Sequence, residues 1–323
     1  MLADCSWTDG RPASKHAVGA PACSAIMTAE MINSFFRRAA CALVIGLVSL
    51  PGQAQDDNFT PFVISGDEVV LRMLRMAEVG PGDFLIDLGS GDGRIPIIAA
   101  RRFGARGFGV DLDPPLVDLA RRNAIRDGVA DKVSFEVKDL FETDLSRASV
   151  VAFYLLPDVA MQLRPKLLKE LRPGTRIVAH DYNLGDWEAD EWTSIRVPDK
   201  PVAPVGISQV FLWIVPGNAR GRWTSDFGGQ RVVFDIDQKF QLLKARVTEQ
   251  GAKTVVGDGS GPPLQVRAAG LRGEQVSIAV AGRLAGRDGV HHLTGRIQGD
   301  HIEGEILTGT RAPERSAWKA SRQ

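Results

Sequence analysis

The sequence of 323 residues predicts an α/β domain with a parallel sheet, followed by an antiparallel β-domain that forms a barrel or a sandwich. Between residues 60 and 216, short apolar runs alternate with segments in which apolar residues recur at helical spacing. After this region, apolar and polar residues alternate, and turn sequences such as GDGSG and GRDG separate the runs. We therefore divide the chain into an upstream segment at 1–54, an α/β domain at 55–216 and a β-domain at 217–323.

Five short apolar runs in the α/β domain are the expected parallel strands. They lie at residues 83–88, 106–112, 133–137, 149–156 and 175–181. The segments with helical spacing lie before and between them, at residues 67–79, 93–104, 114–128 and 159–171. Strands that alternate with helices form a parallel sheet with right-handed crossovers. The last two runs, at 191–197 and 208–215, have no helix between them and are expected to form an antiparallel hairpin at one edge.

Glycine and proline mark several boundaries of these elements. Gly104 is expected to close the second helix and Pro114 to open the third, which are the positions that each residue type favours. Pro165 falls inside the fourth helix, which is expected to tolerate it at a cost in stability. In the β-domain, the sequences TGRIQG and IEGEILTG are expected to pair as the two arms of a hairpin.

The two domains carry opposite net charges. Residues 55–216 hold 19 Lys and Arg against 25 Asp and Glu, a net charge of −6, whereas residues 217–323 hold 16 against 11, a net charge of +5. The whole chain is neutral, so nucleic acid is not expected as its main partner. The positive charge of the β-domain suits either an anionic partner or an ordinary solvated surface.

The N-terminal region is set aside from the fold because residues 31–54 have the pattern of a signal peptide. Arg37 and Arg38 form a basic start, an apolar run follows at 39–50, and small residues precede a cleavage site after Ala54. The apolar run is shorter than a standard membrane span, and an uncleaved membrane anchor is the alternative. We expect export to the cell envelope or periplasm, or anchoring in the inner membrane, with a cytoplasmic location as the alternative.

The upstream segment also holds all of the cysteines, which are Cys5, Cys23 and Cys41. The mature chain is therefore expected to have no disulfide, no thiolate catalysis and no cysteine-ligated zinc. Met31 is a better candidate for the start of translation than Met1, since residues 1–30 show no clear pattern.

The sequence DLGSGDGR at residues 87–94 follows the first expected strand and opens the second helix. A helix N-terminus in this position offers unpaired N–H groups to a ligand. Gly89, Gly91 and Gly93 have the spacing G-x-G-x-G, whereas a nicotinamide dinucleotide loop has a third small residue where Arg94 stands. The loop therefore fits a dinucleotide less well than it fits S-adenosylmethionine, which has no pyrophosphate.

Asp87 and Ser90 complete this candidate cofactor loop. Asp87, directly before the glycines, supplies a carboxylate suited to the ammonium group of S-adenosylmethionine. Ser90 and its neighbours supply backbone N–H groups for the methionine carboxylate. A plain turn between strand and helix is the remaining alternative, but such a turn would not need three glycines.

Two further acidic residues follow the next strands. Asp111 ends the second strand, where a carboxylate can accept hydrogen bonds from both ribose hydroxyls, with Asp113 as a near alternative or a helix cap. Asp139, after the third strand, can accept from an adenine amino group or act only as a turn residue. Together they indicate a nucleoside ligand without choosing between nicotinamide and methyl-donor cofactors.

The acceptor side of the site is expected around the two tyrosines of the chain. Tyr154 and Tyr182 each fall at the carboxyl end of an expected strand, which is the sheet edge where ligands bind, although ordinary ring packing is the alternative. Asp181 and His180 adjoin Tyr182. His180 is either a packed histidine or a proton acceptor.

Four segments together resemble the class I S-adenosylmethionine-dependent methyltransferases: DLGSGDGR, GVDLDPPLVDLARRNA, TPFVISGDEVVLRML and VVAFYLLPDVAMQLRPKLLKELRPGTRIVAHDY. Within this class the chain looks like the group that contains the archaeal broad-specificity protein lysine methyltransferase. The mitochondrial lysine methyltransferases of ATP synthase subunit c and of the adenine nucleotide translocase belong to the same group. The resemblance covers about residues 60–216. It implies a Rossmann-like, seven-stranded sheet, S-adenosyl-L-methionine as the cofactor and a protein lysine as the methyl acceptor.

The resemblance also implies roles for individual residues. Those implied to hold the cofactor are Asp87, Gly89, Gly91 and Asp111. The sequence YLLP, from Tyr154 to Pro157, stands where N-methyltransferases carry the motif for the acceptor nitrogen. The candidate catalytic residues are therefore Tyr154, Pro157, His180, Asp181 and Tyr182. The chain departs from the family at residues 62–66, where FVISG replaces a segment like Tyr-Val-Pro-Thr-Pro.

The function expected from these residues is methyl transfer to nitrogen, with protein lysine as the acceptor. A small-molecule methyltransferase and a non-catalytic module that binds S-adenosylmethionine are the alternatives. No metal is expected, because the sequence has no cluster with the spacing of metal ligands and the sulfonium is already a good leaving group.

Overall fold

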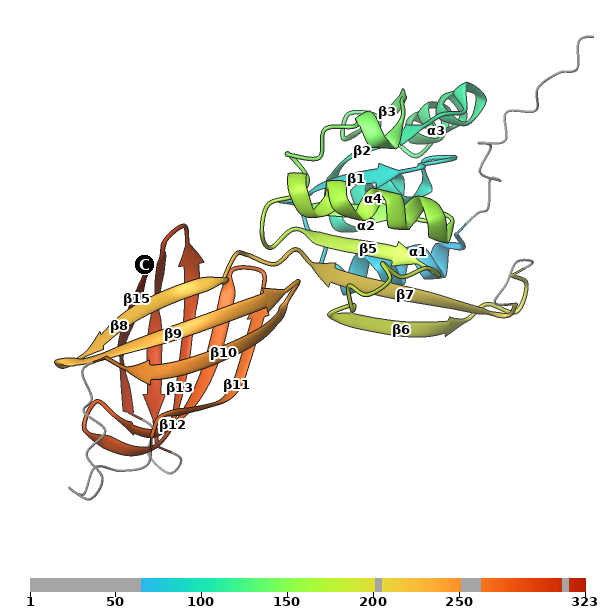
Figure 1. Cartoon of the computed structure of the whole chain (residues 1–323). Coiled ribbons are helices and arrows are strands. Elements are labelled where there is room, and N and C mark those ends of the chain that lie inside the picture. Colours follow the sequence, from blue (N-terminus) through green and yellow to red (C-terminus); the bar gives the residue numbers. More distant parts are fainter. Residues whose placement is uncertain (1–64, 201–204, 251–262, 310–313) are drawn as a thin grey trace, which may run out of the picture. The chain divides into compact units, whose positions relative to one another are not determined.

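The computed structural model of the chain describes residues 65–200, 205–250, 263–309 and 314–323. These residues form two separate sheets, of seven and eight strands, which confirms the predicted fold class (Figure 1). The expected signal peptide or anchor at 31–54, the three cysteines and residues 62–64 lie outside the described residues. Among the residues that are described, no helix is long and apolar enough to cross a membrane.

The first sheet is mixed, with five parallel strands and an antiparallel hairpin at one edge. Its strands are β1 (Phe84–Leu88), β2 (Arg106–Asp111), β3 (Val133–Val137), β4 (Val150–Phe153), β5 (Arg176–His180), β6 (Glu191–Arg196) and β7 (Ile207–Ile214). They lie in the order β3-β2-β1-β4-β5-β7-β6. The edge hairpin predicted from the sequence is confirmed, since β6 pairs antiparallel with β7 and β7 antiparallel with β5. The strand order reverses between β1 and β4, and ligands of such sheets bind beyond the carboxyl ends of the strands at this point.

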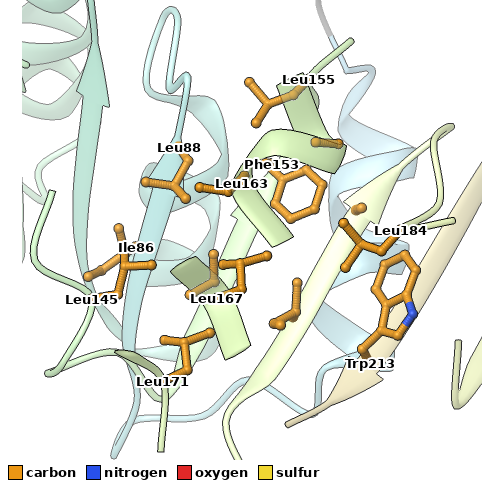
Figure 2. Close-up of a cluster of buried hydrophobic side chains, with 14 of the residues drawn as sticks. Ile86, Leu88, Leu145, Phe153, Leu155, Leu163, Leu167, Leu171, Leu184 and Trp213 are labelled. Carbon is orange, nitrogen blue, oxygen red and sulfur yellow. The ribbon is translucent and has the colours of Figure 1, made fainter. Parts of the chain in front are cut away.

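Helices cover both faces of this sheet (Figure 1). They are α1 (Asp67–Met76), α2 (Arg94–Phe103), α3 (Pro114–Arg126) and α4 (Pro157–Glu170), with a short 3₁₀ helix η1 at Leu140–Glu142. The buried residues of α1 and α2 pack against one face, together with Leu85, Val150 and Val178. Those of α4 pack against the other face (Figure 2), where Ile86, Leu88 and Phe153 point. Alternate residues of each strand therefore fill two different cores, as expected for a buried parallel sheet.

The boundaries between β4 and α4 differ from those predicted. The apolar run predicts a strand that continues to residue 156, but β4 ends at Phe153, and Leu155 packs into the core near Gly89 instead. The helix is predicted from residue 159 but begins at Pro157, because proline needs no hydrogen-bond partner in the first turn. Pro165 lies inside α4, as predicted.

The second sheet is antiparallel throughout. Its strands are β8 (Gly221–Phe227), β9 (Gln230–Lys239), β10 (Leu242–Glu249), β11 (Gln265–Arg272), β12 (Gln275–Leu284), β13 (Arg287–Gln298), β14 (His301–Thr308) and β15 (Glu314–Arg322). The hairpin predicted at TGRIQG and IEGEILTG is confirmed as the pairing of β13 with β14.

This second sheet is a nearly closed barrel rather than a sandwich. Its order is β10-β9-β8-β15-β14-β13-β12-β11, and the two end strands β10 and β11 lie side by side without being hydrogen-bonded neighbours in the described chain. One face of the sheet encloses a single apolar core that includes Trp223, Phe234 and Trp318. The inward-facing side chains fill the interior, which explains the alternating pattern seen in the sequence.

Candidate active site

The glycine loop joins β1 to α2 and lies at the point where the strand order reverses. Gly89, Gly91 and Gly93 all adopt the left-handed conformation, with φ of 79°, 52° and 80°. A side chain on Gly93 would meet the ring of Phe135 at 2.7 Å and Cβ of Ala120 at 2.8 Å. The glycine spacing is therefore required by the backbone path and, at Gly93, by close packing of the loop on β3 and α3.

Asp87 is a buried carboxylate without a protein partner. It is 1% exposed, and neither of its oxygens accepts a hydrogen bond from the described residues. The hydroxyl oxygen of Ser90 is likewise buried and without a partner in this part of the chain. Burial raises the pKa of Asp87 well above its ordinary value, and the charges of Asp111 and Asp92 add to this effect. A ligand ammonium group at Asp87 would supply both the donors and the opposite charge, so these residues fit the amino-acid end of S-adenosylmethionine.

Asp111 lies at the carboxyl end of β2 and holds the glycine loop in place. Its Oδ2 accepts a hydrogen bond of 2.8 Å from the Gly91 N–H, and its Oδ1 accepts one of 3.0 Å from the Asp113 N–H. Each oxygen keeps a second lone pair, which a ribose hydroxyl can use. Asp113 occupies the N-cap position of α3, but its side chain makes no capping hydrogen bond.

Asp139 caps η1 and is only partly buried. Its Oδ1 accepts a hydrogen bond of 2.7 Å from the Phe141 N–H, so the residue has the turn role that the sequence left open. In the described part of the chain, its Oδ2 accepts no hydrogen bond and is free to meet an adenine amino group. The capping role and the adenine contact use different oxygens and do not compete.

The structure brings four of the five candidate catalytic residues together at the ends of β4 and β5. The Tyr154 hydroxyl donates a hydrogen bond of 2.9 Å to Oδ2 of Asp181. The Tyr154 ring lies with its centroid 3.9 Å from that of His180 and 6.2 Å from that of Tyr182. Pro157, the fifth candidate, is the exposed first residue of α4. Burial raises the pKa of Tyr154 above its ordinary value, with the Asp181 charge adding to the effect, so the phenol stays protonated at neutral pH.

His180 is held on both of its ring nitrogens by hydroxyl groups. Its Nδ1 lies 2.8 Å from Oγ of Ser65, and its Nε2 lies 2.9 Å from Oγ of Ser208. Burial lowers the pKa of His180 to about 4, an effect that the Asp181 charge opposes and the Lys200 charge reinforces. This arrangement favours a packed, neutral histidine over a proton acceptor.

We expect the imidazole of His180 to stay neutral at pH values well below the ordinary pKa of a histidine. In an NMR titration of the full chain, its ring resonances should shift with a midpoint near pH 4, since burial penalises the charged form. His301, which is exposed, serves as the internal control. A His180→Asn variant assigns the resonance, and a midpoint above pH 6 would contradict the buried placement.

Several residues of the site were not predicted from the sequence. Ser65 and Ser208 bind His180, Arg94 donates to the carbonyl of Ser65 at 2.7 Å, and Lys200 pairs with Asp181. Arg94 thereby links the start of α1 to the cofactor loop. No described group of three or more His, Cys, Asp or Glu side chains could hold a metal ion.

The comparisons with known proteins agree with this geometry. The family model described as "ANTKMT methyltransferase domain" matches residues 87–191. A protein-lysine N-methyltransferase of Saccharolobus islandicus (strain REY15A) is 41% identical over 140 residues, which are 43% of this chain and 86% of that protein. The adenine nucleotide translocase lysine N-methyltransferase of Mus musculus is 34% identical over 169 residues, which are 52% of this chain and 68% of that protein.

A solved structure is also similar. It is an RNA methyltransferase from Salinibacter ruber in complex with S-adenosyl-L-homocysteine, and it is 47% identical, with a TM-score of 0.44. The match covers 48% of this chain and 95% of that structure. The resemblance inferred from the sequence is thus confirmed by the relatives: the chain belongs to the class I S-adenosylmethionine-dependent methyltransferases, in the group of the protein lysine methyltransferases.

Proposed function

We propose that this protein transfers the methyl group of S-adenosylmethionine to the side-chain nitrogen of lysine in a protein substrate. The observation that carries this proposal is the 41% identity to a protein-lysine N-methyltransferase over 86% of that protein's length. The cluster of Tyr154, Asp181 and Tyr182 at the ends of β4 and β5 supports this proposal from the structure. The strand β4 is the direct neighbour of β1, which leads into the cofactor loop, so the polar groups of the cluster lie at the same edge of the sheet as that loop.

The proposed cofactor-binding residues contact three parts of S-adenosylmethionine, which are its amino-acid end, its ribose and its adenine. Asp87 binds the ammonium group, and the loop from Gly89 to Gly93 offers backbone N–H groups to the carboxylate. Asp111 accepts from the ribose hydroxyls, and Asp139 from the adenine amino group. When bound, S-adenosylmethionine supplies an activated methyl group on a positively charged sulfur.

The acceptor residues align the nucleophile rather than act as a strong base. The lone pairs of Tyr154 oxygen can receive a hydrogen bond from the lysine nitrogen, since its hydrogen is already donated to Asp181. A lysine has a pKa of about 10.4 in water, which falls in an apolar pocket next to a cation. Alignment of the reacting atoms can supply roughly 7–11 kcal/mol of the barrier reduction.

The Tyr154→Phe variant is expected to lower kcat by about 10-fold and leave the affinity for S-adenosylmethionine within about twofold. The lost hydroxyl contacts the acceptor nitrogen and not the cofactor, and a hydrogen bond to a charged group is worth about 1.5–3 kcal/mol. Turnover on poly-L-lysine and isothermal calorimetry with S-adenosylmethionine measure the two quantities. Trp192→Phe, at an exposed aromatic residue of β6, is the control, and equal losses of turnover in both variants would contradict the special role of Tyr154.

The acceptor class is tested with the purified full chain and methyl-labelled S-adenosylmethionine. The probes are poly-L-lysine and a cell extract, and hydrolysis of the labelled protein fraction is expected to release methylated lysines. Label that is lost on nuclease treatment would indicate RNA instead, and label in the low-molecular-weight filtrate would indicate a small molecule. Cofactor binding without any transfer would indicate a non-catalytic binding protein.

We propose further that the chain is exported to the cell envelope or anchored in the inner membrane. The basis is the sequence pattern at residues 31–54. Cell fractionation with a C-terminal reporter tests this location, and a reporter found only in the cytoplasm would contradict it. N-terminal sequencing of the mature protein separates cleavage after Ala54 from retention of an anchor.

A further inference from the structure

Lys200 is a buried lysine that no motif of the sequence predicts. It lies in the connection between β6 and β7, where its N–H donates to the Val197 carbonyl at 3.1 Å. Its side chain is only 5% exposed. An ammonium group rarely stays in such a place unless several acceptors surround it.

Two acceptors fix the Lys200 ammonium in this position. It donates to Oδ2 of Asp181 and, at 2.8 Å, to the carbonyl of Ile207. The Asp181 side chain has no exposed surface, so both members of the pair are buried. Among the Lys and Arg ion pairs of the described residues, no other has both side chains buried to this extent. A buried ion pair contributes little net stability, because the cost of removing both charges from water offsets their attraction.

Both carboxylate oxygens of Asp181 accept hydrogen bonds from the protein. Its Oδ1 accepts a hydrogen bond of 3.0 Å from the Gln209 N–H, while its own N–H donates to the Gln209 carbonyl at 2.7 Å. Its Oδ2 accepts from both Lys200 and the Tyr154 hydroxyl. The backbone of Asp181 is in the left-handed region, with φ of 64°, which a non-glycine residue adopts only when its surroundings hold it there. These contacts make Asp181 a fixed acceptor for the Tyr154 hydroxyl, because its two oxygens and its backbone are all held by the protein.

The direction of the Tyr154 hydroxyl follows from this arrangement. Because a carboxylate only accepts hydrogen bonds, the Tyr154 hydrogen must point at Asp181. The lone pairs of the tyrosine oxygen then point away from Asp181 and are available to a donor. In a protein that methylates an amine, the acceptor nitrogen is such a donor.

We propose that Lys200 is a positioning residue for methyl transfer: it fixes Asp181 as a charged acceptor and thereby sets the direction in which Tyr154 receives the substrate nitrogen. This inference rests on the proposed function, because it needs an amine acceptor at Tyr154. Among the described residues, the side chain of Lys200 hydrogen-bonds only to Asp181 and Ile207, so it acts on the acceptor position through Asp181.

The first test is a double-mutant cycle on kcat, with poly-L-lysine as the acceptor probe. Lys200→Met, which removes the charge but keeps the apolar stem, is expected to lower kcat by up to about 10-fold, which is no more than the loss expected for removing the Tyr154 hydroxyl itself. In a Tyr154→Phe background the same change should cost less than about threefold, since both residues act through one hydrogen bond. Lys200→Arg should restore part of the loss. The matched control is Lys132→Met, at an exposed lysine of the same domain.

Two further measurements, of cofactor affinity and of methylation of Lys200 itself, distinguish a positioning role of Lys200 from a role in cofactor binding or as a substrate. Calorimetry should give Lys200→Met the wild-type affinity for S-adenosylmethionine within about twofold, which also shows that the variant is folded. An unchanged kcat, or an equal loss of kcat in both backgrounds, would overturn the proposal. Mass spectrometry that finds Lys200 methylated after incubation with the cofactor would also overturn it, since the residue would then be a substrate.

A second measurement needs no acceptor and so remains valid if the proposed function is wrong. The chain has two tyrosines, so labelling with tyrosine carrying ¹³C at Cζ gives two resonances, which Tyr154→Phe assigns. Lys200→Met is expected to shift the Tyr154 resonance more than that of Tyr182, because it alters the acceptor of the Tyr154 hydroxyl. Equal positions of the Tyr154 resonance in wild type and variant would refute the coupling. Failure of lysine methylation together with this shift would instead count against the proposed substrate.

Discussion

Replacing Asp87 by asparagine is expected to weaken S-adenosylmethionine binding by about 100-fold or more and, at the same time, to stabilise the ligand-free protein. The affinity falls because a charge-assisted contact with the ligand ammonium is worth about 1.5–3 kcal/mol, and more in a buried site. The stability rises because the Asp87 carboxylate is buried and has no protein donor among the described residues. Asparagine has nearly the same shape and removes the charge.

The pH dependence of this stability effect has a definite sign. The pKa of Asp87 in the folded protein is raised, so the folded state binds the proton more tightly than the unfolded state. The carboxylate therefore destabilises the protein at neutral pH, and this cost disappears as the pH falls towards the ordinary range of an aspartate. The gain from Asp87→Asn should be largest at neutral pH and should disappear as the pH falls to the ordinary pKa of an aspartate, about 4.

Two measurements test the Asp87 prediction in parallel. Calorimetry gives the dissociation constant, and thermal unfolding with and without S-adenosylmethionine gives the midpoint and its ligand-induced shift. A gain of 1 kcal/mol raises the midpoint by about 2–4 °C for a domain of this size. Asp131→Asn, at an exposed aspartate that makes no side-chain hydrogen bond or ion pair with the described residues, is the control for a change in net charge alone. Cofactor binding at full strength by Asp87→Asn would refute the assignment of this residue.

The helices and strands of the first domain were predicted well from the sequence. The spacing of apolar residues indicates which side chains are buried, and in this domain the buried side chains are those that face the sheet or lie within it. The alternation of β1 between two cores, with Leu85 on one side and Ile86 on the other, accounts for its continuous apolar run. The order of the strands does not follow from periodicity and was not predicted, since the family resemblance implied only a Rossmann-like sheet of seven strands. The predicted end of β4 was too far along the chain. Leu155 is apolar because it packs into the core near Gly89, and not because it belongs to the strand.

Candidate site residues could be named from the sequence where their place at the end of a strand or in a loop was enough to suggest a role. Asp87, Asp111 and Tyr154 all follow from their places at strand ends. Ser65 and Lys200 could not be predicted, because their partners lie far away in the chain, at His180 and Asp181. A buried polar group is identified by its surroundings, and these exist only after the sheet has formed.

Replacing Gly93 by alanine is expected to destabilise the protein by about 3 kcal/mol and to weaken cofactor binding. The left-handed backbone, with φ of 80°, costs an L-residue about 1–2 kcal/mol. Overpacking adds about 1–3 kcal/mol, because the new Cβ would lie 2.7 Å from the Phe135 ring and 2.8 Å from Cβ of Ala120. Relief of this clash displaces the loop whose N–H groups we propose to face the cofactor, so the affinity is expected to fall with the stability.

Two control variants separate backbone strain from the steric clash at Gly93. Gly128→Ala carries only the strain, since Gly128 has φ of 68° and no atom lies within 4 Å of the position that its Cβ would take, and Gly82→Ala carries neither. The unfolding free energy measured in urea should therefore fall most for Gly93→Ala, less for Gly128→Ala and hardly at all for Gly82→Ala. A second change, Phe135→Leu, removes part of the ring that the new methyl group meets. In the Phe135→Leu background, Gly93→Ala should cost less than in the wild type, because the two changes share one contact. Equal costs in both backgrounds would show that the contact with Phe135 is not what makes glycine necessary, and would leave the left-handed backbone and the contact with Ala120 as the reasons for it.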